Sequence, residues 1–310
     1  MKNSQTKPKT TDETAKKLSA PTSKTTLYTR RFLRNKLAVF GVFILLALIL
    51  FAIIGPLVSP WHYSDSDFLS LRQPPNSNHW FGTNAQGNDL FAQTAHGVGR
   101  SLIIGFAVSI STTLIAAAVG TSTAYFGALG PVGRWGEKLM LTLINFLLIM
   151  PAFLIIALLI NALGGSWQLL ILVLVLFGWM GAARVIWSLA MSLREREFVT
   201  AARYMGVGWL KIIFRHMIPN IGSLLIIQMT LGVQATVMAE TSYSFLGLGV
   251  KQPDVSLGSL LSGVGDILYS APWLFYFPAA TLTLITLAAA FIADGLRDAL
   301  DPNSAAGGKA

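Results

Sequence analysis

Long apolar runs alternate with short polar segments along the 310-residue chain. The first run, residues 37–58, carries no charged side chain. As a helix rising about 1.5 Å per residue it would be about 33 Å long, enough to cross the roughly 30 Å hydrocarbon core of a bilayer. Five similar runs follow. The pattern predicts six transmembrane helices, at residues 37–58, 101–125, 138–162, 168–191, 217–241 and 272–294.

The overall composition agrees with a membrane protein. Hydrophobic residues make up 53% of the chain and charged residues only 12%, which lies outside the range of soluble globular domains. The chain has no cysteine, so disulfides and cysteine nucleophiles are excluded. The net charge of +9 comes from basic residues beside the apolar runs. We therefore expect a lipid bilayer, and no nucleic acid, as the partner of these charges.

The distribution of basic residues predicts the orientation. Of the 23 Lys and Arg residues, nineteen fall on one side of the six predicted helices, and only Arg72, Arg100 and Lys251 fall on the other. Because cytoplasmic loops are enriched in Lys and Arg, both termini are expected in the cytoplasm. A cleaved signal peptide is the alternative for the first run, but that run is too long and lacks an A-x-A cleavage site.

This topology divides the chain into segments. The N-terminal tail is rich in Lys, Thr, Ser and Pro and cannot bury enough apolar surface to offset the entropy of ordering, so we expect it to be disordered. The expected segments are a basic cytoplasmic tail (1–36), a first transmembrane helix (37–58), an extracytoplasmic segment (59–99), a core of five helices (100–296) that includes a second extracytoplasmic segment (242–271), and a cytoplasmic C-terminus (297–310).

A charged segment, residues 194–220, interrupts the apolar pattern with the sequence REREFVTAARYMGVGWLKIIFRHMIPN. Phe198, Ala201, Ala202 and Met205 fall at positions i, i+3, i+4 and i+7, which predicts a short helix with one narrow apolar face. We interpret this segment as a docking surface for a partner outside the membrane. Its alanines would allow that partner to approach closely.

The same segment contains the expected helix ends. Gly206 suits a left-handed turn at the end of the first short helix, because glycine tolerates that conformation best. Helical spacing then resumes from residue 209 to 217, with Lys211 and Arg215 on the polar face. Pro219 is expected in the first turn of the helix that follows.

The segment resembles the cytoplasmic EAA loop of importer-type ABC transporter permeases. In that family the pattern is E-A-A, three residues, Gly, nine residues, then I-x-L-P. Ala201, Ala202 and Gly206 match it, whereas Thr200 replaces the Glu and His216 replaces the first Ile. The resemblance implies that the loop contacts an ATPase subunit, with the contact residues expected at Phe198, Ala201, Ala202, Arg203, Met205 and Gly206.

Three further blocks are similar to the C-type permease of peptide and nickel importers. Residues 79–92 resemble H-x-x-G-T-D-x-x-G-R-D-x-x-S, with Asn84 and Asn88 in place of the Asp and the Arg. Glu240 precedes SFLGLG at residues 244–249, and residues 294–302 read DGLRDALDP. The four blocks occur in the family's order and span most of the chain.

This resemblance implies an all-α type I ABC importer permease fold in a bacterial inner membrane. The expected partners are a homologous permease, two ATPase subunits or a fused ATPase, and an extracytoplasmic solute-binding protein. The cargo would be di- or oligopeptides, with nickel or another small solute as the alternative. ATP and Mg would be bound by the partners, and no cofactor is expected in this chain.

The chain itself shows no pattern for nucleotide or metal chemistry. It contains no G-x-x-x-x-G-K-[ST] sequence, and its four histidines form no i, i+4 pair. We therefore expect neither an enzyme nor a metal site. A self-sufficient channel or secondary transporter is the alternative from another class, and it would transport without ATPase partners. A purely structural scaffold would not co-purify with ATPase subunits.

Several polar residues lie within the apolar runs. Hydrocarbon penalises such groups, so they are expected to face other helices or the transport pathway. For Glu240 the alternative is a hydroxyl partner in the adjacent Thr-Ser-Tyr-Ser run. The pathway candidates are Asn145, Gln228, Gln234 and Glu240.

Three other residues carry local expectations. Arg184 is expensive in the membrane unless its side chain extends to the interface or pairs with a neighbour, which is what we expect. Asp294 and Arg297 are expected to form an ion pair at a helix end. Pro151 is expected to kink the third transmembrane helix.

Overall fold

The computed structural model describes residues 24–300, and apart from two isolated β-bridges its regular structure there is helical. The helices are α2 (Lys24–Arg34), α3 (Lys36–Val58), α4 (Leu90–Gly127), α5 (Pro131–Ile149), α6 (Ala152–Ala162), α7 (Trp167–Arg194), α8 (Glu197–Tyr204), α9 (Trp209–Ile212), α10 (Gly222–Phe245), α11 (Leu257–Leu261) and α12 (Trp273–Leu300). A π-helical turn at Ile213–Met217 and a 3-10 turn at Ile218–Ile221 join α9 to α10, and a third short turn lies at Gly265–Ile267.

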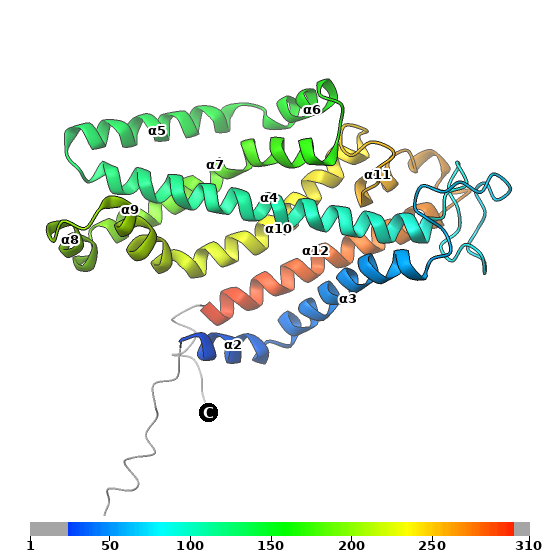
Figure 1. Ribbon diagram of the computed structural model, residues 1–310, viewed down its shortest axis with the longest axis horizontal. Coiled ribbons are helices and arrows are strands. Elements are labelled where there is room, and N and C mark those ends of the chain that lie inside the picture. Colours follow the sequence, from blue (N-terminus) through cyan, green and yellow to red (C-terminus); the bar gives the residue numbers. More distant parts are fainter. Residues whose placement is uncertain (1–23, 301–310) are drawn as a thin grey trace, which may run out of the picture.

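The arrangement confirms an all-α membrane fold. Five helical segments are long and apolar enough to cross a membrane, namely α3, α4, α7, α12 and the stretch from Trp209 to Phe245. A sixth span is formed if the bent pair of α5 and α6 is counted as one. The long helices run side by side, with α8 and α9 at one end and the loop after α3 together with α11 at the other (Figure 1). The described chain ends, at α2 and α12, lie toward the α8 end.

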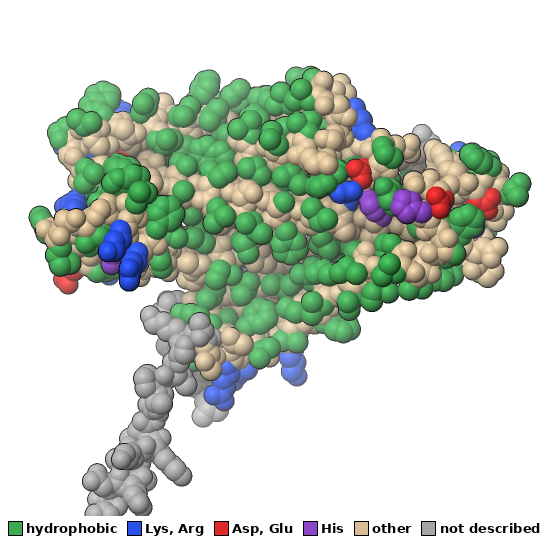
Figure 2. Space-filling model, viewed as in Figure 1, with side chains coloured by type: hydrophobic (Ala, Val, Ile, Leu, Met, Phe, Trp, Pro, Cys, Tyr) green, Lys and Arg blue, Asp and Glu red, His purple; other side chains and the backbone are tan. Residues whose placement is uncertain are grey.

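The surface follows the same division. Hydrophobic side chains cover most of the middle of the face seen in Figure 2, whereas His side chains and acidic groups gather toward the loop end and Lys and Arg stand out near α8 and α2. Exposed apolar residues such as Phe43, Leu114 and Leu172 come from helices with a membrane-spanning length. These apolar side chains are unfavourable in water, so the belt fits the hydrocarbon core of a lipid bilayer.

The bend after α5 lies at the predicted proline. Helix α5 ends at Ile149, and Pro151 is the N-cap of α6. The two helix axes differ by 74°. Proline lacks the N–H group that would continue the helix and clashes with the preceding turn, so the chain changes direction there.

The expected start of the second transmembrane helix is wrong by eleven residues. Helix α4 begins at Leu90 and has 38 residues, because the Asp89 side chain accepts a hydrogen bond of 2.8 Å from the amide of Ala92 and caps the helix. Residues 90–99, expected in an irregular extracytoplasmic segment, are therefore helical. The buried Val98 and Leu102 pack with α3, α10 and α12, which extends the core past the expected boundary.

The expectation of a disordered tail is wrong for residues 24–34, which form the amphipathic helix α2. This helix packs against α12 and ends before Asn35, whose side chain caps α3. The apolar Leu27, Tyr28 and Phe32 gave the segment more capacity to pack than its basic composition suggested. The rest of the tail and residues 301–310, which include the Asp-Pro end of the fourth block, lie outside the described residues.

Candidate functional site

The first short helix of the charged segment ends as the sequence predicts. Gly206 has a φ of +74°, in the left-handed region. Its amide bonds to the carbonyl of Arg203, and the amide of Val207 bonds to the carbonyl of Ala202, both at 3.1 Å. These two bonds are the pair that closes a helix in a Schellman turn. Any other residue at position 206 would be strained, because a Cβ disfavours this conformation.

The predicted single apolar face of α8 is divided in the structure. Ala202 and Val199 are buried against the π-helical turn and the end of α4. Phe198, Ala201 and Met205 point away from the bundle, with exposed fractions of 40% for Phe198 and 75% for Met205. The expectation that Ala202 shares their face is therefore wrong. Val199 and Ala202, three residues apart, form an inner apolar stripe that attaches α8 to the rest of the chain.

The second half of the charged segment is also attached by its apolar side. Ile212, Ile213 and Met217 are fully buried, while Lys211 and Arg215 are exposed as predicted. The expected continuous helix is instead α9 followed by a π-helical turn, and Pro219 lies in the first turn of the next helical element, as expected. The result is a surface, which we call the coupling surface, made of Phe198, Ala201, Arg203, Tyr204, Met205 and Gly206.

A charged cluster fixes the base of the coupling surface. The guanidinium of Arg194 lies 3.3 Å from the Glu137 carboxylate and donates a 2.8 Å hydrogen bond to the carbonyl of Ala124. Trp187 donates from its indole N–H to the same carboxylate at 2.7 Å. These contacts join the ends of α4, α5 and α7. Sequence reasoning missed Glu137, although an acidic residue at a predominantly basic membrane end was a usable signal.

The four pathway candidates are not brought together. Asn145 lines a groove between α5 and α7 with Lys138 and Trp187, and that groove contains no α10 residue. Gln228 and Gln234 are partly exposed along α10. Asn145, Gln228 and Gln234 therefore do not form one polar cluster.

Glu240 does not face an open pathway. It is fully buried, and its carboxylate accepts hydrogen bonds from the hydroxyls of Ser256, Ser244 and Ser101, at 2.5, 2.7 and 3.1 Å. Ser244 belongs to the adjacent polar run, so the alternative of a nearby hydroxyl partner is correct. Ser101, from α4, and Ser256, the N-cap of α11, were not foreseen.

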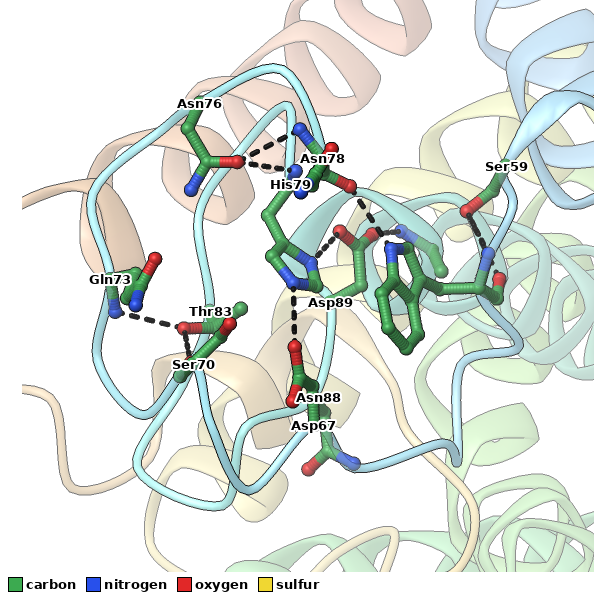
Figure 3. A network of polar contacts seen from close by, with 12 residues as sticks. Ser59, Asp67, Ser70, Gln73, Asn76, Asn78, His79, Thr83, Asn88 and Asp89 are labelled. Atoms are coloured by element: carbon green, nitrogen blue, oxygen red, sulfur yellow. Dashed lines mark hydrogen bonds and ion pairs between the residues drawn. The ribbon is translucent and has the colours of Figure 1, made fainter.

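At the opposite end, the loop between α3 and α4 folds around a buried histidine (Figure 3). The His79 ring lies 2.9 Å from Asp89 through Nδ1 and 3.6 Å from Asp67 through Nε2, and it stacks on Trp61. Hydrogen bonds from the Ser70 hydroxyl and the Leu69 amide, aided by His79, hold the pKa of Asp67 below its ordinary value. Because Asp89 also caps α4, this network fixes where the helix starts.

The two asparagines that depart from the family pattern have a structural role in this loop. The Asn84 side chain donates to the Asn88 side chain at 3.0 Å and accepts from the Asn88 amide at 2.9 Å. Asn88 in turn donates to the Asp65 carbonyl and the Ser66 hydroxyl. A neutral amide pair thus occupies the place where the family pattern has an Asp and an Arg.

A second cluster joins this loop end to the segment before α11. Arg100 lies 2.5 Å from Asp254 and stacks over the Trp167 ring at 4.2 Å. Beside it is a cavity of about 490 Å³ between the α3–α4 loop and the segment after α10. Its polar lining includes Arg72, Asn84, Gln86, Gln93, Lys251 and Gln252.

One local expectation for charged residues is wrong, and a second, that the Arg184 side chain extends to the membrane interface or pairs with a neighbour, stays a prediction. Asp294 and Arg297 are exposed and form no ion pair with each other, and Asp298 accepts a 3.0 Å hydrogen bond from Asn35 instead. Exposed charges gain little from pairing, so solvent competes successfully. Arg184 is exposed on α7 and has no ion-pair partner among residues 24–300.

The apolar belt and the long helices that run side by side define an integral membrane protein. Residues 120–305 match the family model for the binding-protein-dependent transport system inner membrane component. Residues 26–75 match the N-terminal transmembrane domain of oligopeptide transport permease C. The chain belongs to the binding-protein-dependent transport system inner membrane component family, and it is a multi-pass inner membrane protein.

Curated relatives match nearly the whole chain. The oligopeptide transport system permease protein OppC of Mycobacterium tuberculosis is 46% identical over 284 residues, covering 91% of this chain and 96% of the relative. The dipeptide transport system permease protein DppC of Bacillus subtilis is 36% identical, covering 88% and 84%. A putative peptide permease protein of Brucella suis is 36% identical, covering 88% and 89%.

Proposed function

We propose that this chain is a permease subunit of an ATP-driven importer of di- or oligopeptides. The observation that carries the proposal is the coupling surface, in which Phe198 and Met205 are exposed on a helix otherwise attached firmly to the bundle. An exposed apolar patch on a rigid base fits a site where another protein binds. The names of the curated relatives favour peptides as the cargo.

The partners follow from the same surface. ATPase subunits, or a fused ATPase, would bind the coupling surface through Phe198, Ala201, Met205 and the adjacent Arg203, with ATP and Mg held in those partners. A homologous permease would complete the pathway, and a solute-binding protein would deliver cargo at the opposite end. We propose alternating access as the mechanism, in which ATP binding closes the ATPase pair and moves the coupling surface.

We propose an orientation in which the coupling surface lies in the cytoplasm. The Lys and Arg bias supports this assignment, since most basic residues lie on the side of the coupling surface and of the chain ends. The α3–α4 loop and the segment between α10 and α12 would then face outward. Asn145, Gln228 and Gln234 are the proposed polar positions of the pathway, and Ala202 positions α8 from beneath.

The test is reconstitution of the complex in liposomes. The purified permease pair, ATPase subunits and binding protein should take up a labelled peptide when ATP is supplied on the side of the coupling surface. Uptake that proceeds without ATPase subunits would instead identify a self-sufficient transporter. Absence of co-purifying ATPase would support a scaffold.

The cargo is tested separately. Mass spectrometry of the ligand bound to the purified solute-binding protein should find a peptide, and an excess of that peptide should compete with the labelled one. Recovery of nickel or of another small solute, with no competition by peptides, would favour the alternative cargo.

A further inference from the structure

The outer end of α10 contains a carboxylate that the proposed function does not use. Glu240 is fully buried, five residues before the helix ends at Phe245. A buried carboxylate is costly unless every oxygen has donors. Here three serine hydroxyls supply them, from three different elements: Ser244 of α10, Ser101 of α4 and Ser256 at the start of α11.

Each of these hydroxyls also accepts a backbone N–H group. The hydroxyl of Ser244 accepts from the amide of Val250 at 3.1 Å, and that of Ser101 accepts from the amide of Leu257 at 3.2 Å. The Ser256 hydroxyl accepts from the amide of Ser259, also at 3.2 Å. A hydroxyl that accepts an N–H bond has its single proton free to donate. All three protons point to one acceptor, Glu240.

The hydrogen bonds therefore run in one direction, from the backbone of residues 250–259 through the serines to Glu240. We call residues 246–261 the outer segment. Glycines bring it close to α10, since a Cβ on Gly258 would lie 2.6 Å from Thr241 Cα and one on Gly249 would lie 2.6 Å from the Ser244 amide nitrogen. The outer segment is thus held on α10 by close packing and by hydrogen bonds that meet at Glu240, and the ion pair of Asp254 with Arg100 also ties it to α4.

Helix α10 also connects this point to the coupling surface. From Gly222 to Phe245 the helix is uninterrupted, and the turns that precede it follow directly from α9. Motion at the start of α10 would therefore reach Glu240 along one continuous helix. Through Ser101 the carboxylate also holds α4, so two long helices and the outer segment meet at one residue.

We propose that Glu240 is a positioning residue that makes the outer segment move with α10 and α4 during transport, and so opens and closes the outer side of the pathway. This inference rests on the proposed function. The cavity beside the outer segment lies between Gln252 and Gln86 of the loop that leads into α4, so it would keep its width while both parts move together.

The chain has no cysteine, so two introduced cysteines can carry spin labels specifically. In Gln86→Cys with Gln252→Cys, the distance between labels is measured in the full reconstituted complex, without nucleotide and with ATP trapped by vanadate. We expect the distance distribution to stay the same on trapping, because the outer segment and the loop that leads into α4 move together. Adding Glu240→Gln should make the distance change on trapping, because the amide nitrogen that replaces one carboxylate oxygen would face a serine hydroxyl proton, which it cannot accept.

Transport by the same complexes is measured in parallel. Glu240→Gln should lower peptide uptake about tenfold while ATP hydrolysis stays within about twofold, since the substitution removes one hydrogen bond to a charged group. Ser244→Ala should act in the same direction. Ser242→Ala is the matched control, because the exposed Ser242 bonds only to a carbonyl of its own helix.

The outcomes separate the two proposals. An unsubstituted complex without ATP-driven uptake contradicts the proposed function, whereas normal uptake and a constant label distance in Glu240→Gln overturn the role of Glu240. Lower uptake with a label distance that stays constant on trapping also overturns it. If Glu240→Gln does not accumulate in the membrane, Ser256→Ala and Ser101→Ala, which keep the carboxylate and two donors, decide by the same two readouts.

Discussion

The two ends of the helical bundle differ in how they place polar and apolar side chains. At the α8 end, Phe198 and Met205 are exposed, although they are apolar. At the opposite end, His79 and Asp89 are buried, although both can carry charge, and each lies within 3 Å of the other. One end presents apolar side chains on a short helix that is attached to the bundle by its buried face, and the other buries ionisable groups against each other inside a loop. Phe68 and Leu69 of that loop are also exposed, so the two ends differ in their buried polar groups and not in apolar exposure alone.

The largest effect should come from disturbing the exposed end at its turn. Replacing Gly206 with Val places a β-branched residue at a φ of +74°, which costs on the order of 1–3 kcal/mol and should lower ATP-driven uptake about tenfold or more. Gly208→Ala is the control, because Gly208 has a φ of −58° and open space for a Cβ. Equal uptake by both variants would remove the turn from the coupling mechanism.

A charge on the outer face of α8 should have the next largest effect. Ala201→Glu places a carboxylate where the ATPase is expected, and we expect about a tenfold loss of uptake with unchanged thermal stability of the isolated permease. Ala202→Glu, one position along, should instead lower that stability because Ala202 is buried. If the two variants behave alike in a thermal unfolding assay, the division of α8 into two faces is wrong.

The base of the coupling surface should respond through stability. Glu137→Ala leaves the partly buried guanidinium of Arg194 and the indole of Trp187 without their shared acceptor, which should cost about 1–3 kcal/mol. A lower unfolding temperature in detergent would show this loss. In a double-mutant cycle with Arg194→Ala, additive effects would indicate that the pair is not coupled.

The amide pair of Asn84 and Asn88 in the α3–α4 loop should tolerate only paired changes. Asn84→Asp removes the amide that donates to Asn88, and a loss of about 1 kcal/mol is expected. Adding Asn88→Arg supplies an opposite charge and should restore part of the stability. Limited proteolysis of the α3–α4 loop reports the order of both variants. A double variant that is cleaved faster than Asn84→Asp alone would show that the loop cannot accept the family's charged pair.

The smallest effect is expected from acid. The pKa of Asp67 is lowered in the folded loop, so its ionised form stabilises the loop above the ordinary value of 3.8, and this contribution disappears as the pH falls below that value. Limited proteolysis of the α3–α4 loop by an acid-active protease should become faster as the pH falls below that value. In Asp67→Asn this change in acid should be smaller; an identical change would assign it to another group.

Elements set by local chemistry were predictable from the sequence. Apolar runs gave the transmembrane helices, Pro151 gave the bend, and Gly206 gave the end of α8, because each depends on neighbours within a few residues. The start of α4 was missed because Asp89 lies in a polar, turn-rich stretch whose packing around His79 is not local. Glu137 pairs with Arg194 across 57 positions. No periodicity reveals such a contact.

The candidate site was partly predictable for the same reason. The spacing of Phe198, Ala201 and Met205 identified residues that share exposure, but it could not separate Ala202, since the inner stripe depends on what packs beneath α8. For Glu240, the serine in its own helix could be foreseen. Ser101 and Ser256 lie 139 and 16 positions away and meet the carboxylate only in the folded chain.

The length of α4 has a mechanical consequence. At about 1.5 Å per residue its 38 residues extend about 57 Å, well beyond the roughly 30 Å hydrocarbon core. Its first turn is capped by Asp89, and near its last turn the carbonyl of Ala124 is held by Arg194. A push on the α3–α4 loop would therefore tilt a single stiff lever whose far end rests on the base of the coupling surface.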